Sequence, residues 1–471
     1  MAVLRPDHPE ERYVLFVLPK DPDKEVWTGK RAGLDEAKQI FGADAAYSVE
    51  EIDTRIPKYL ENVERLYYRM GKHETFDGKM LQWIERLRAQ VRAGISAPTQ
   101  ILDPATLLHE HRLFKNPDEV AILKKAGAIT REAHLAAMRT ARPGNHEYQV
   151  EAAVDFVFRD RGGVGPGYPS IVASGANATT LHYITNNRRM EEGELMLLDA
   201  GCEVGYYTAD VTRTFPVSGK YSEPQRAVYE AVLEAQLAGI EKVRPGIKFQ
   251  DVHDEAARVL VKNLVKLGIL QGDVTDLIAK GQHRRFFMHR TSHWLGMDVH
   301  DCGNYYVNGA SRALEPGMVL TVEPGLYFSE SDSAVPRFRG IGVRIEDDVL
   351  VVAPPTARRR ARCSPRIFPR PRPRSSRPSA DESQRSAARR ASGGDGWDRD
   401  RWNRARGEWL RFGLGTPYEL RLDANEAVDV TLEAPREEIY EAAIAEIRQR
   451  GAVEVSSLEG VGSSAKSATR P

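Results

Sequence analysis

Four segments in the first 353 residues place apolar side chains at the spacing of one helical face. Asn116-Pro117 and a capping box that begins at Ser222 open two of them, and glycines such as Gly144 and Gly268 follow their ends. These signals predict helices over about residues 116–141, 147–161, 222–243 and 250–267.

Apolar runs of another kind lie between these helices. They are short, rich in β-branched and aromatic residues, and bounded by glycine or polar residues, which is typical of strands. The β-rich stretches are 196–202, 206–215, 318–328 and 341–352. Helix pairs interleaved with such strands predict an α+β domain.

One helix end is repeated later in the chain. Residues 133–144 (AHLAAMRTARPG) and 235–246 (AQLAGIEKVRPG) match at six of twelve positions, 102 residues apart (235 − 133). In both copies a second predicted helix follows the Pro-Gly stop. We therefore expect two duplicated helix–turn–helix halves, with a site built between them.

Composition limits the class of protein. The 471 residues include 67 basic and 67 acidic side chains, and 41% of them are hydrophobic, which predicts two or three soluble domains. Balanced charge gives no argument for a nucleic-acid or anionic-membrane partner, and no apolar run has the length of a membrane span or a signal peptide. Three scattered cysteines argue against a disulfide framework and favour a reducing compartment, the cytoplasm.

The basic residues are unevenly distributed. Nine arginines and no acidic residue lie between Arg358 and Arg377, interspersed with prolines. This composition predicts a disordered Arg/Pro/Ser-rich segment over 354–407; nucleic-acid binding is the less favoured alternative, and translation in a shifted reading frame is a further hypothesis. Strand patterns at 418–422 and 428–433 and a helical pattern at 435–450 predict a small α+β tail over 408–471, of unknown role.

Two aspartates interrupt the first pair of predicted strands. Asp199 ends an apolar strand, and Asp210 follows eleven positions later (210 − 199), beyond a turn at Gly205. A hairpin of this length brings the two carboxylates face to face. Like charges side by side in a buried sheet are costly, and a shared cation removes that cost.

Three further candidate ligands follow. His293 lies in a His-rich stretch, and Glu323 and Glu346 interrupt apolar strand runs, where an unpaired charge would cost several kcal/mol. Two Asp, two Glu and one His form an oxygen-rich set that suits Mn²⁺, Co²⁺ or Fe²⁺ better than structural zinc. Four carboxylates can neutralise and bridge two divalent ions, which could hold a bridging hydroxide and polarise a carbonyl.

Six strings of the sequence together resemble the Xaa-Pro aminopeptidases (aminopeptidase P), which belong to the pita-bread metallopeptidase family. The resemblance covers residues 3–353, and the strings from position 181 onward are the most specific. The strings are LLHEHRLFKNPDEVAILKKAG (107–127), LHYITNN (181–187), LLDAGCEVGYYTADVTRTFPVSGKYS (197–222), FFMHRTSHWLGMDVHDCG (286–303), EPGMVLTVEPGLYF (315–328) and GIGVRIEDDVLVV (340–352).

The resemblance implies the domain organisation. A pita-bread (creatinase/aminopeptidase-like) catalytic domain with pseudo-two-fold symmetry would occupy 115–353, preceded by a partial aminopeptidase P N-terminal α/β domain at 1–114. In the family this domain normally begins further upstream. We therefore expect several tens of its residues to be missing and its sheet to be incomplete.

The resemblance also implies an activity and a metal centre. The protein would use a hydroxide bridging two divalent metals, usually Mn²⁺, to remove an N-terminal residue that precedes proline. Asp199 would ligate one metal, His293 and Glu323 the other, and Asp210 and Glu346 would bridge both.

Further residues are implied in catalysis and substrate binding. His182, His289 and His300 would line the substrate site, and His300 would hydrogen-bond the peptide carbonyl or the oxyanion. Glu323 would move the proton, and Arg344 and Tyr327 would support the ligands. Trp27 would help cover the substrate pocket, often from a neighbouring subunit, so a homo-oligomer is expected if the N-terminal domain is intact.

Two alternatives stay open at this stage. A prolidase, which cleaves Xaa-Pro dipeptides, would use the same fold, and a catalytically inactive pita-bread protein could serve as a binding module. The presence of all five ligands argues against the inactive module. The preferred first residue, the peptide length, the physiological metal and the oligomeric state are not determined by the sequence.

Overall fold

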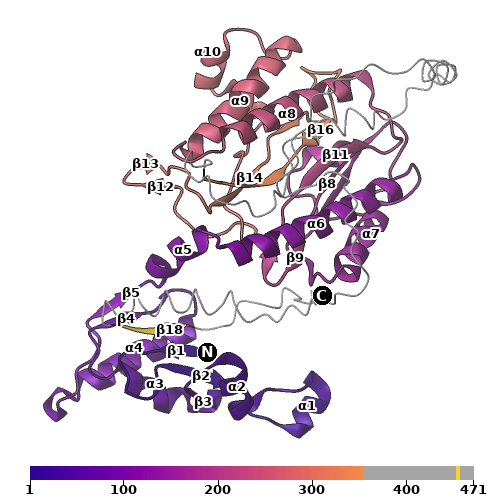
Figure 1. The fold of residues 1–471 in the computed structure, drawn as a ribbon. Coiled ribbons are helices and arrows are strands. Elements are labelled where there is room, and N and C mark those ends of the chain that lie inside the picture. The colour runs from indigo at the N-terminus through magenta and orange to yellow at the C-terminus, as the bar shows by residue number, and fades with distance from the viewer. Residues whose placement is uncertain (354–451, 457–471) are drawn as a thin grey trace, which may run out of the picture. The chain divides into compact units, whose positions relative to one another are not determined.

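The computed structural model describes residues 1–353 and 452–456 (Figure 1). They divide into two compact units: residues 1–111 together with strand β18 (Ala452–Ser456), and a unit that begins at Arg112. The predicted segment 354–407, and the strands and helix predicted between 418 and 450, lie outside the described residues. Within the described ranges, no helix combines the length and the hydropathy that a membrane crossing requires.

The first unit is built on one mixed sheet with the strand order β3-β2-β1-β18-β4-β5. Strand β1 is antiparallel to both β2 and β18, whereas β18 is parallel to β4. The remaining pairs, β2–β3 and β4–β5, are parallel. The strands are β1 (Ala2–Leu4), β2 (Tyr13–Val17), β3 (Ala45–Ser48), β4 (Arg65–Tyr67) and β5 (Gln100–Leu102).

Helices cover both faces of this sheet. Alternate residues of each strand point to opposite faces, so Val14 and Phe16 join a core with α3 and α4, while Leu15 packs toward α2. The unit is therefore an α/β layer structure. The helices are α1 (Pro22–Thr28), α2 (Gly33–Phe41), α3 (Ile52–Leu60) and α4 (Glu74–Arg88), and α5 (Ala105–Leu113) follows them.

The second unit contains the four helices predicted from the sequence. Asn116 caps α6 through its side chain and Pro117 occupies its first turn, while Ser222 and Gln225 form the capping box of α8. The observed ends agree with the predicted ends to within a residue or two. The helices are α6 (Pro117–Thr140), α7 (Glu147–Asp160), α8 (Glu223–Lys242), α9 (Phe249–Lys266) and the shorter α10 (Val274–Ala279).

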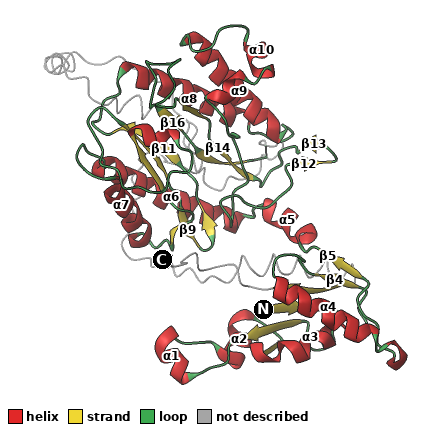
Figure 2. Cartoon of the chain, turned by 180° about the vertical axis from the view of Figure 1, so that it is seen from behind, coloured by secondary structure: helices red, strands yellow, loops and turns green. Residues whose placement is uncertain are grey.

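Strands β8, β11, β14 and β16 of this unit lie between the two helix pairs, α6–α7 and α8–α9 (Figures 1 and 2). All four predicted β-rich stretches contain strands. The strands are β6 (Gly165–Pro166), β7 (Ile171–Ser174), β8 (Leu195–Asp199), β9 (Cys202–Val204), β10 (Tyr207–Thr208), β11 (Thr212–Pro216), β12 (Tyr306–Val307), β13 (Ala310–Ser311), β14 (Val319–Val322), β15 (Gly325–Tyr327), β16 (Gly342–Arg344) and β17 (Asp347–Leu350).

The duplication expected from the sequence appears as two similar halves. The connections α6–α7 and α8–α9 have equal length, and each contains a glycine with positive φ, Gly144 (95°) and Gly246 (86°). The halves meet at β11 and β16, where the Thr214 hydroxyl donates to the Arg344 carbonyl oxygen (2.9 Å). This arrangement confirms the predicted α+β fold with two related halves.

Candidate active site

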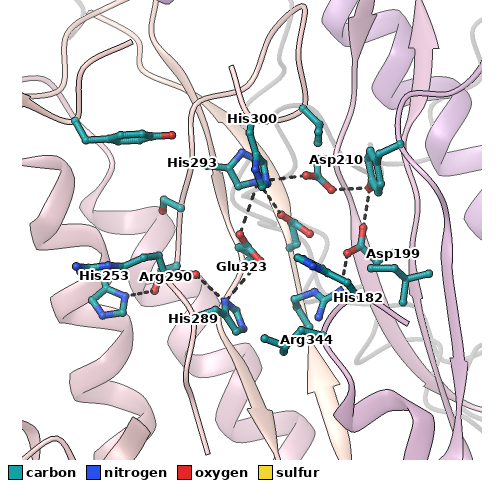
Figure 3. Close-up of a pocket in the computed structure, with 18 of the residues that line it drawn as sticks. His182, Asp199, Asp210, His253, His289, Arg290, His293, His300, Glu323 and Arg344 are labelled. Atoms are coloured by element: carbon teal, nitrogen blue, oxygen red, sulfur yellow. Dashed lines mark hydrogen bonds and ion pairs between the residues drawn. The ribbon is translucent and has the colours of Figure 1, made fainter. Parts of the chain in front are cut away.

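A cavity of about 790 Å³ lies in the second unit (Figure 3). Nine of the predicted site residues line it: His182, Asp199, Asp210, His289, His293, His300, Glu323, Arg344 and Glu346. Asp199 and Arg344 end β8 and β16, Asp210 precedes β11, and Glu323 and Glu346 lie beside β14 and β17, whereas the four histidines lie in loops. Residues separated by more than 160 positions therefore share one cavity.

The hairpin predicted around the two aspartates is present. Asp199 is the last residue of β8 and pairs in register with Thr212 of the antiparallel β11, two positions after Asp210. The small β9–β10 hairpin fills the connection and turns at Gly205 and Tyr206, both with positive φ. The Tyr168 hydroxyl lies 2.7 Å from Asp199 Oδ1 and 2.6 Å from Asp210 Oδ1, which shows how close the two carboxylates come.

The other three predicted ligands face Asp210. His293 Nε2 lies 3.3 Å from Asp210 Oδ2, 3.7 Å from Glu323 Oε1 and 4.0 Å from Glu346 Oε1. Glu323 directly follows β14, and Glu346 sits between β16 and β17. Strand ends from both halves, together with the loop that carries His293, thus bring all five predicted ligands together.

The donor set fits divalent cations. Donor atoms of Asp210, His293 and Glu346 lie within 4.8 Å of one another. The Nδ1 atom of His293 lies 3.0 Å from the Trp294 carbonyl oxygen, an arrangement that leaves Nε2 to face the carboxylates. Carboxylate oxygens and one imidazole nitrogen are ligands that Mn²⁺ and similar ions accept.

The pKa values of the cluster are shifted in the direction that reduces its negative charge. Burial, together with neighbouring carboxylates, raises the pKa of Asp210 and of Glu346, and burial raises the pKa of Glu323 to about 7. Burial by itself would lower the pKa of His293, but the hydrogen bond and charge of Asp210 raise it to about 9. The cluster therefore attracts positive charge, which bound cations could supply in place of protons.

The three candidate substrate histidines surround this cluster. The His300 ring lies 4.3 Å from the His293 ring, measured between centroids, and burial lowers the pKa of His300. His289 Nδ1 lies 3.8 Å from Glu323 Oε2, and burial lowers the pKa of His289 to about 4, so its imidazole is neutral at pH 7. His182 lines the cavity from an exposed position after β7.

Arg344 and Tyr327 form a buried chain behind the cluster. Arg344 Nη2 lies 2.6 Å from Asp199 Oδ2, and Nη1 donates to the Tyr327 hydroxyl (3.0 Å). The same hydroxyl lies 2.9 Å from His289 Nε2. Tyr327 is not part of the cavity lining, so it contacts the site only through its neighbours.

Two residues at the site were not predicted. Tyr168 bonds both aspartates, and the buried Thr212 hydroxyl donates to Glu346 Oε2 (2.7 Å). Tyr168 follows a glycine-rich loop that carries no catalytic signature, whereas Thr212 lies two positions after Asp210 on the same strand. Strand alternation, which puts residues i and i+2 on one face, could have suggested Thr212.

Trp27 belongs to a different unit from the residues that line the cavity. It belongs to α1 of the first unit, is 87% exposed, and is not among the residues that line the cavity. Its predicted role at a substrate pocket stays a prediction.

Comparison with known proteins agrees with the architecture. Residues 121–353 match metallopeptidase family M24, and residues 1–67 match the aminopeptidase P N-terminal domain. The chain is 43% identical to the Xaa-Pro aminopeptidase of Escherichia coli K12 over 351 residues, which are 74% of this chain and 79% of that protein.

Two solved structures show the same fold. The Pseudomonas aeruginosa aminopeptidase PepP superposes with a TM-score of 0.73 at 44% identity, covering 74% of this chain and 79% of that one. Zinc-substituted E. coli aminopeptidase P, in complex with product, gives a TM-score of 0.70 at 44% identity, covering 72% and 77%. The chain therefore belongs to metallopeptidase family M24 and, with its N-terminal domain, to the aminopeptidase P proteins of that family.

Proposed function

We propose that this chain is a metal-dependent aminopeptidase that hydrolyses the bond between an N-terminal residue and proline. The observation that carries the proposal is the convergence of Asp199, Asp210, His293, Glu323 and Glu346 on one wall of a cavity large enough for part of a peptide. Relatives of similar architecture bear the name Xaa-Pro aminopeptidase. Family membership and donor chemistry thus support the same reaction.

The five ligands are proposed to hold two divalent cations, most favourably Mn²⁺. Asp199 would bind one ion, His293 and Glu323 the other, and Asp210 and Glu346 both. Such a pair, when bound, would lower the pKa of the attacking water and polarise the scissile carbonyl. The raised pKa values of Asp210, Glu323 and Glu346 support this assignment, because each carboxylate is costly to ionise without a nearby cation.

The protein's own groups would complete the reaction. Glu323 would take a proton from the attacking water and pass it to the departing proline nitrogen, because it is a carboxylate at the edge of the metal cluster. His300, at the edge of the cluster, would donate a hydrogen bond to the carbonyl oxygen as negative charge develops on it. Arg344 would hold Asp199 in place.

Two properties of the proline residue would favour it at the second position of the substrate. A tertiary amide has no N–H to donate, and the pyrrolidine ring fixes φ. A site without an acceptor for that N–H therefore loses nothing with proline, and a peptide already bent by proline enters with less ordering cost.

Metal content and turnover on the purified chain test the proposal together. We expect about two Mn²⁺ per chain and release of X from an X-Pro-Y tripeptide. Asp210→Ala should lose metal and turnover, whereas Asp160→Ala, an exposed aspartate outside the cavity, should keep both. Cleavage of X-Pro dipeptides alone would assign a prolidase, and an intact protein with neither metal nor turnover would favour a binding module.

Three further expectations concern the oligomeric state, the cellular location and nucleic-acid binding. A homo-oligomer would explain why the apolar Trp27 and Val26 side chains of α1 are exposed, at 87% and 81%, because a second copy could cover them. We also expect a cytoplasmic location, because three scattered cysteines are typical of a protein from a reducing compartment. Nucleic-acid binding by residues 354–407 would require salt-sensitive binding that disappears when this segment is deleted.

A further inference from the structure

One charged side chain in the cavity has no part in the proposed reaction. Arg290 follows His289 in the chain, is exposed, and lines the cavity. Figure 3 shows Arg290 and His253 on the side of the site away from Asp199 and Asp210. The cavity therefore has an acidic wall and, across from it, a cationic one.

A neutral partner orients the Arg290 guanidinium. Arg290 Nη1 donates to Gln250 Oε1 (3.0 Å), and the Gln250 amide is held in turn by Asp254, whose Oδ1 accepts from Nε2 at 2.8 Å. The Gln250 backbone N–H donates to the Ser311 hydroxyl (3.0 Å), which fixes the residue on the same wall. Arg290 is thus positioned by hydrogen bonds that do not neutralise its charge.

No carboxylate contacts the Arg290 guanidinium directly in the part of the chain that the structure describes, and the hydrogen bonds described above connect Asp254 to it only through the Gln250 amide. Within the described residues, Arg290 forms no ion pair, and the single hydrogen bond from its side chain leaves most of its five N–H donors unused. Tyr306 and Ser311, which also line the cavity, carry no charge. Burial lowers the pKa of His253 to about 4, so that side chain is neutral at pH 7. The other arginine in the lining, Arg344, is buried against Asp199.

A short peptide has the complementary charge pattern. With two divalent cations bound, the four carboxylates of the cluster would be neutralised, and the Arg290 guanidinium would remain as a charge on the opposite side of the cavity. The guanidinium repels the N-terminal ammonium of a peptide and attracts a carboxylate, so the end that follows proline points toward it. A guanidinium binds a carboxylate through two parallel hydrogen bonds, better than it binds any neutral group. The charge of Arg290 would thus orient the substrate.

We propose that Arg290 binds a carboxylate of the substrate beyond the proline, and makes this enzyme selective for peptides that present one there. The inference rests on the proposed function. The carboxylate could be the C-terminus of a tripeptide or the side chain of an acidic residue, and the test distinguishes these two sources.

Three substrates with the same first two residues provide the test: X-Pro-Gly, X-Pro-Gly-amide and X-Pro-Asp-amide. The metal-loaded wild-type chain should show a kcat/KM roughly five- to tenfold higher for the free acid than for the amide, mainly through KM. Arg290→Gln should bring this ratio near one, and Arg290→Lys should restore part of it. Arg258→Gln, an exposed arginine of α9 outside the cavity, should leave the ratio at the wild-type value.

Each result has a distinct meaning. Preference for X-Pro-Asp-amide over X-Pro-Gly-amide, lost in Arg290→Gln, would assign a side-chain carboxylate as the ligand. An acid-to-amide ratio that is unchanged in Arg290→Gln, or equal rates for all three substrates in the wild type, would overturn the inference while leaving the aminopeptidase in place. Absence of turnover with all three substrates in the metal-loaded wild type would overturn the proposed function and the inference with it.

Discussion

At the scale of single residues, the candidate ligands are oriented by neighbours that do not bind metal themselves. Arg344 holds Asp199, the Thr212 hydroxyl holds Glu346, and Asp348 Oδ2 accepts from the Asp210 backbone N–H (3.1 Å). Such contacts fix the direction in which a ligand presents its free oxygen. Their removal should therefore weaken metal binding without removing a ligand.

Thr212→Val tests this expectation. Valine has nearly the shape of threonine but cannot donate to Glu346, so we expect metal affinity to fall by roughly 10- to 100-fold. Isothermal titration with Mn²⁺ would measure the change. Thr140→Val, which removes a threonine hydroxyl bonded only to its own helix, should leave affinity unchanged; equal affinity in both variants would contradict the role of Thr212.

A histidine outside the site predicts the pH dependence of stability. His134 is fully buried in α6, its Nε2 lies 3.1 Å from the Ala200 carbonyl oxygen, and burial lowers its pKa to about 4. In the unfolded chain the pKa of histidine is about 6.5. Between these values the unfolded chain binds a proton that the folded chain excludes, so stability is full above pH 6.5 and falls as the pH drops toward 4.

Urea unfolding at two pH values would measure how much stability the protonation of His134 removes. Between pH 7.5 and 5.0, His134 alone should remove roughly 2 kcal/mol from the free energy of unfolding of the wild type. His134→Gln cannot take up the proton, so it should lose less stability over the same interval, whatever its stability at pH 7.5. Equal losses in the two proteins would refute the prediction.

At the scale of helices and strands, the metal ligands depend on strand ends from two halves. Strand β11 of the first half lies beside β16 of the second, and Arg213 of β11 pairs with Asp347 of β17 (2.6 Å) in a buried salt bridge. Gln236 of α8 donates to the same carboxylate (2.8 Å). The junction between the halves is thus fixed by buried polar contacts as well as by strand packing.

Strand β18 shows another case of distant segments meeting. Its register places Val455 opposite Val3 of β1 and Val453 opposite Leu66 of β4. Val3 and Leu66 are both fully buried in the core that includes α3 and α4. The position between β1 and β4, in the middle of the sheet, is therefore held by a segment from the far end of the chain.

Val453→Pro tests the contribution of β18. Proline lacks the N–H that a central strand donates to its neighbour, so pairing with β1 or β4 should be lost. We expect backbone amides of β1 and β4 to exchange roughly tenfold faster or more, while those of β8 and β11 keep their rates. Ser467→Pro is the control, and unchanged exchange in β1 and β4 would show that β18 does not stabilise the sheet.

At the scale of the whole molecule, all five candidate ligands lie in one of the two compact units. A ligand that binds only the folded state stabilises the part that binds it, by about 2.7 kcal/mol at a concentration 100 times its Kd. Metal should therefore stabilise the second unit selectively.

Hydrogen exchange with and without metal measures this selectivity. After removal of metal with EDTA and addition of excess Mn²⁺, slow-exchanging amides of α6, α8 and β8 should gain protection, and those of α3 and α4 should not. Asp210→Ala should show no gain in either unit. An equal gain in both units of the wild type would mean that the units unfold together.

Much of the catalytic unit was predictable from the sequence. Capping residues such as Asn116 and Ser222 act through bonds to their own helix, so local sequence suffices to locate α6 and α8. The ligand candidates Asp199, Glu323 and Glu346 stand out because a charge within an apolar strand run is costly without a partner. These signals require no knowledge of distant contacts.

Other features were decided by the tertiary structure. The bond of Tyr168 to both aspartates, the contact of Arg290 with Gln250 and the place of β18 in the N-terminal sheet join segments far apart in the chain. The sequence by itself determined where the four long helices and the main strands of the second unit lie and which carboxylates require a counter-charge, because these depend on local propensity and on the cost of burying charge. Only folding decided which side chains face one another across the cavity, because that depends on how strands from separate segments align.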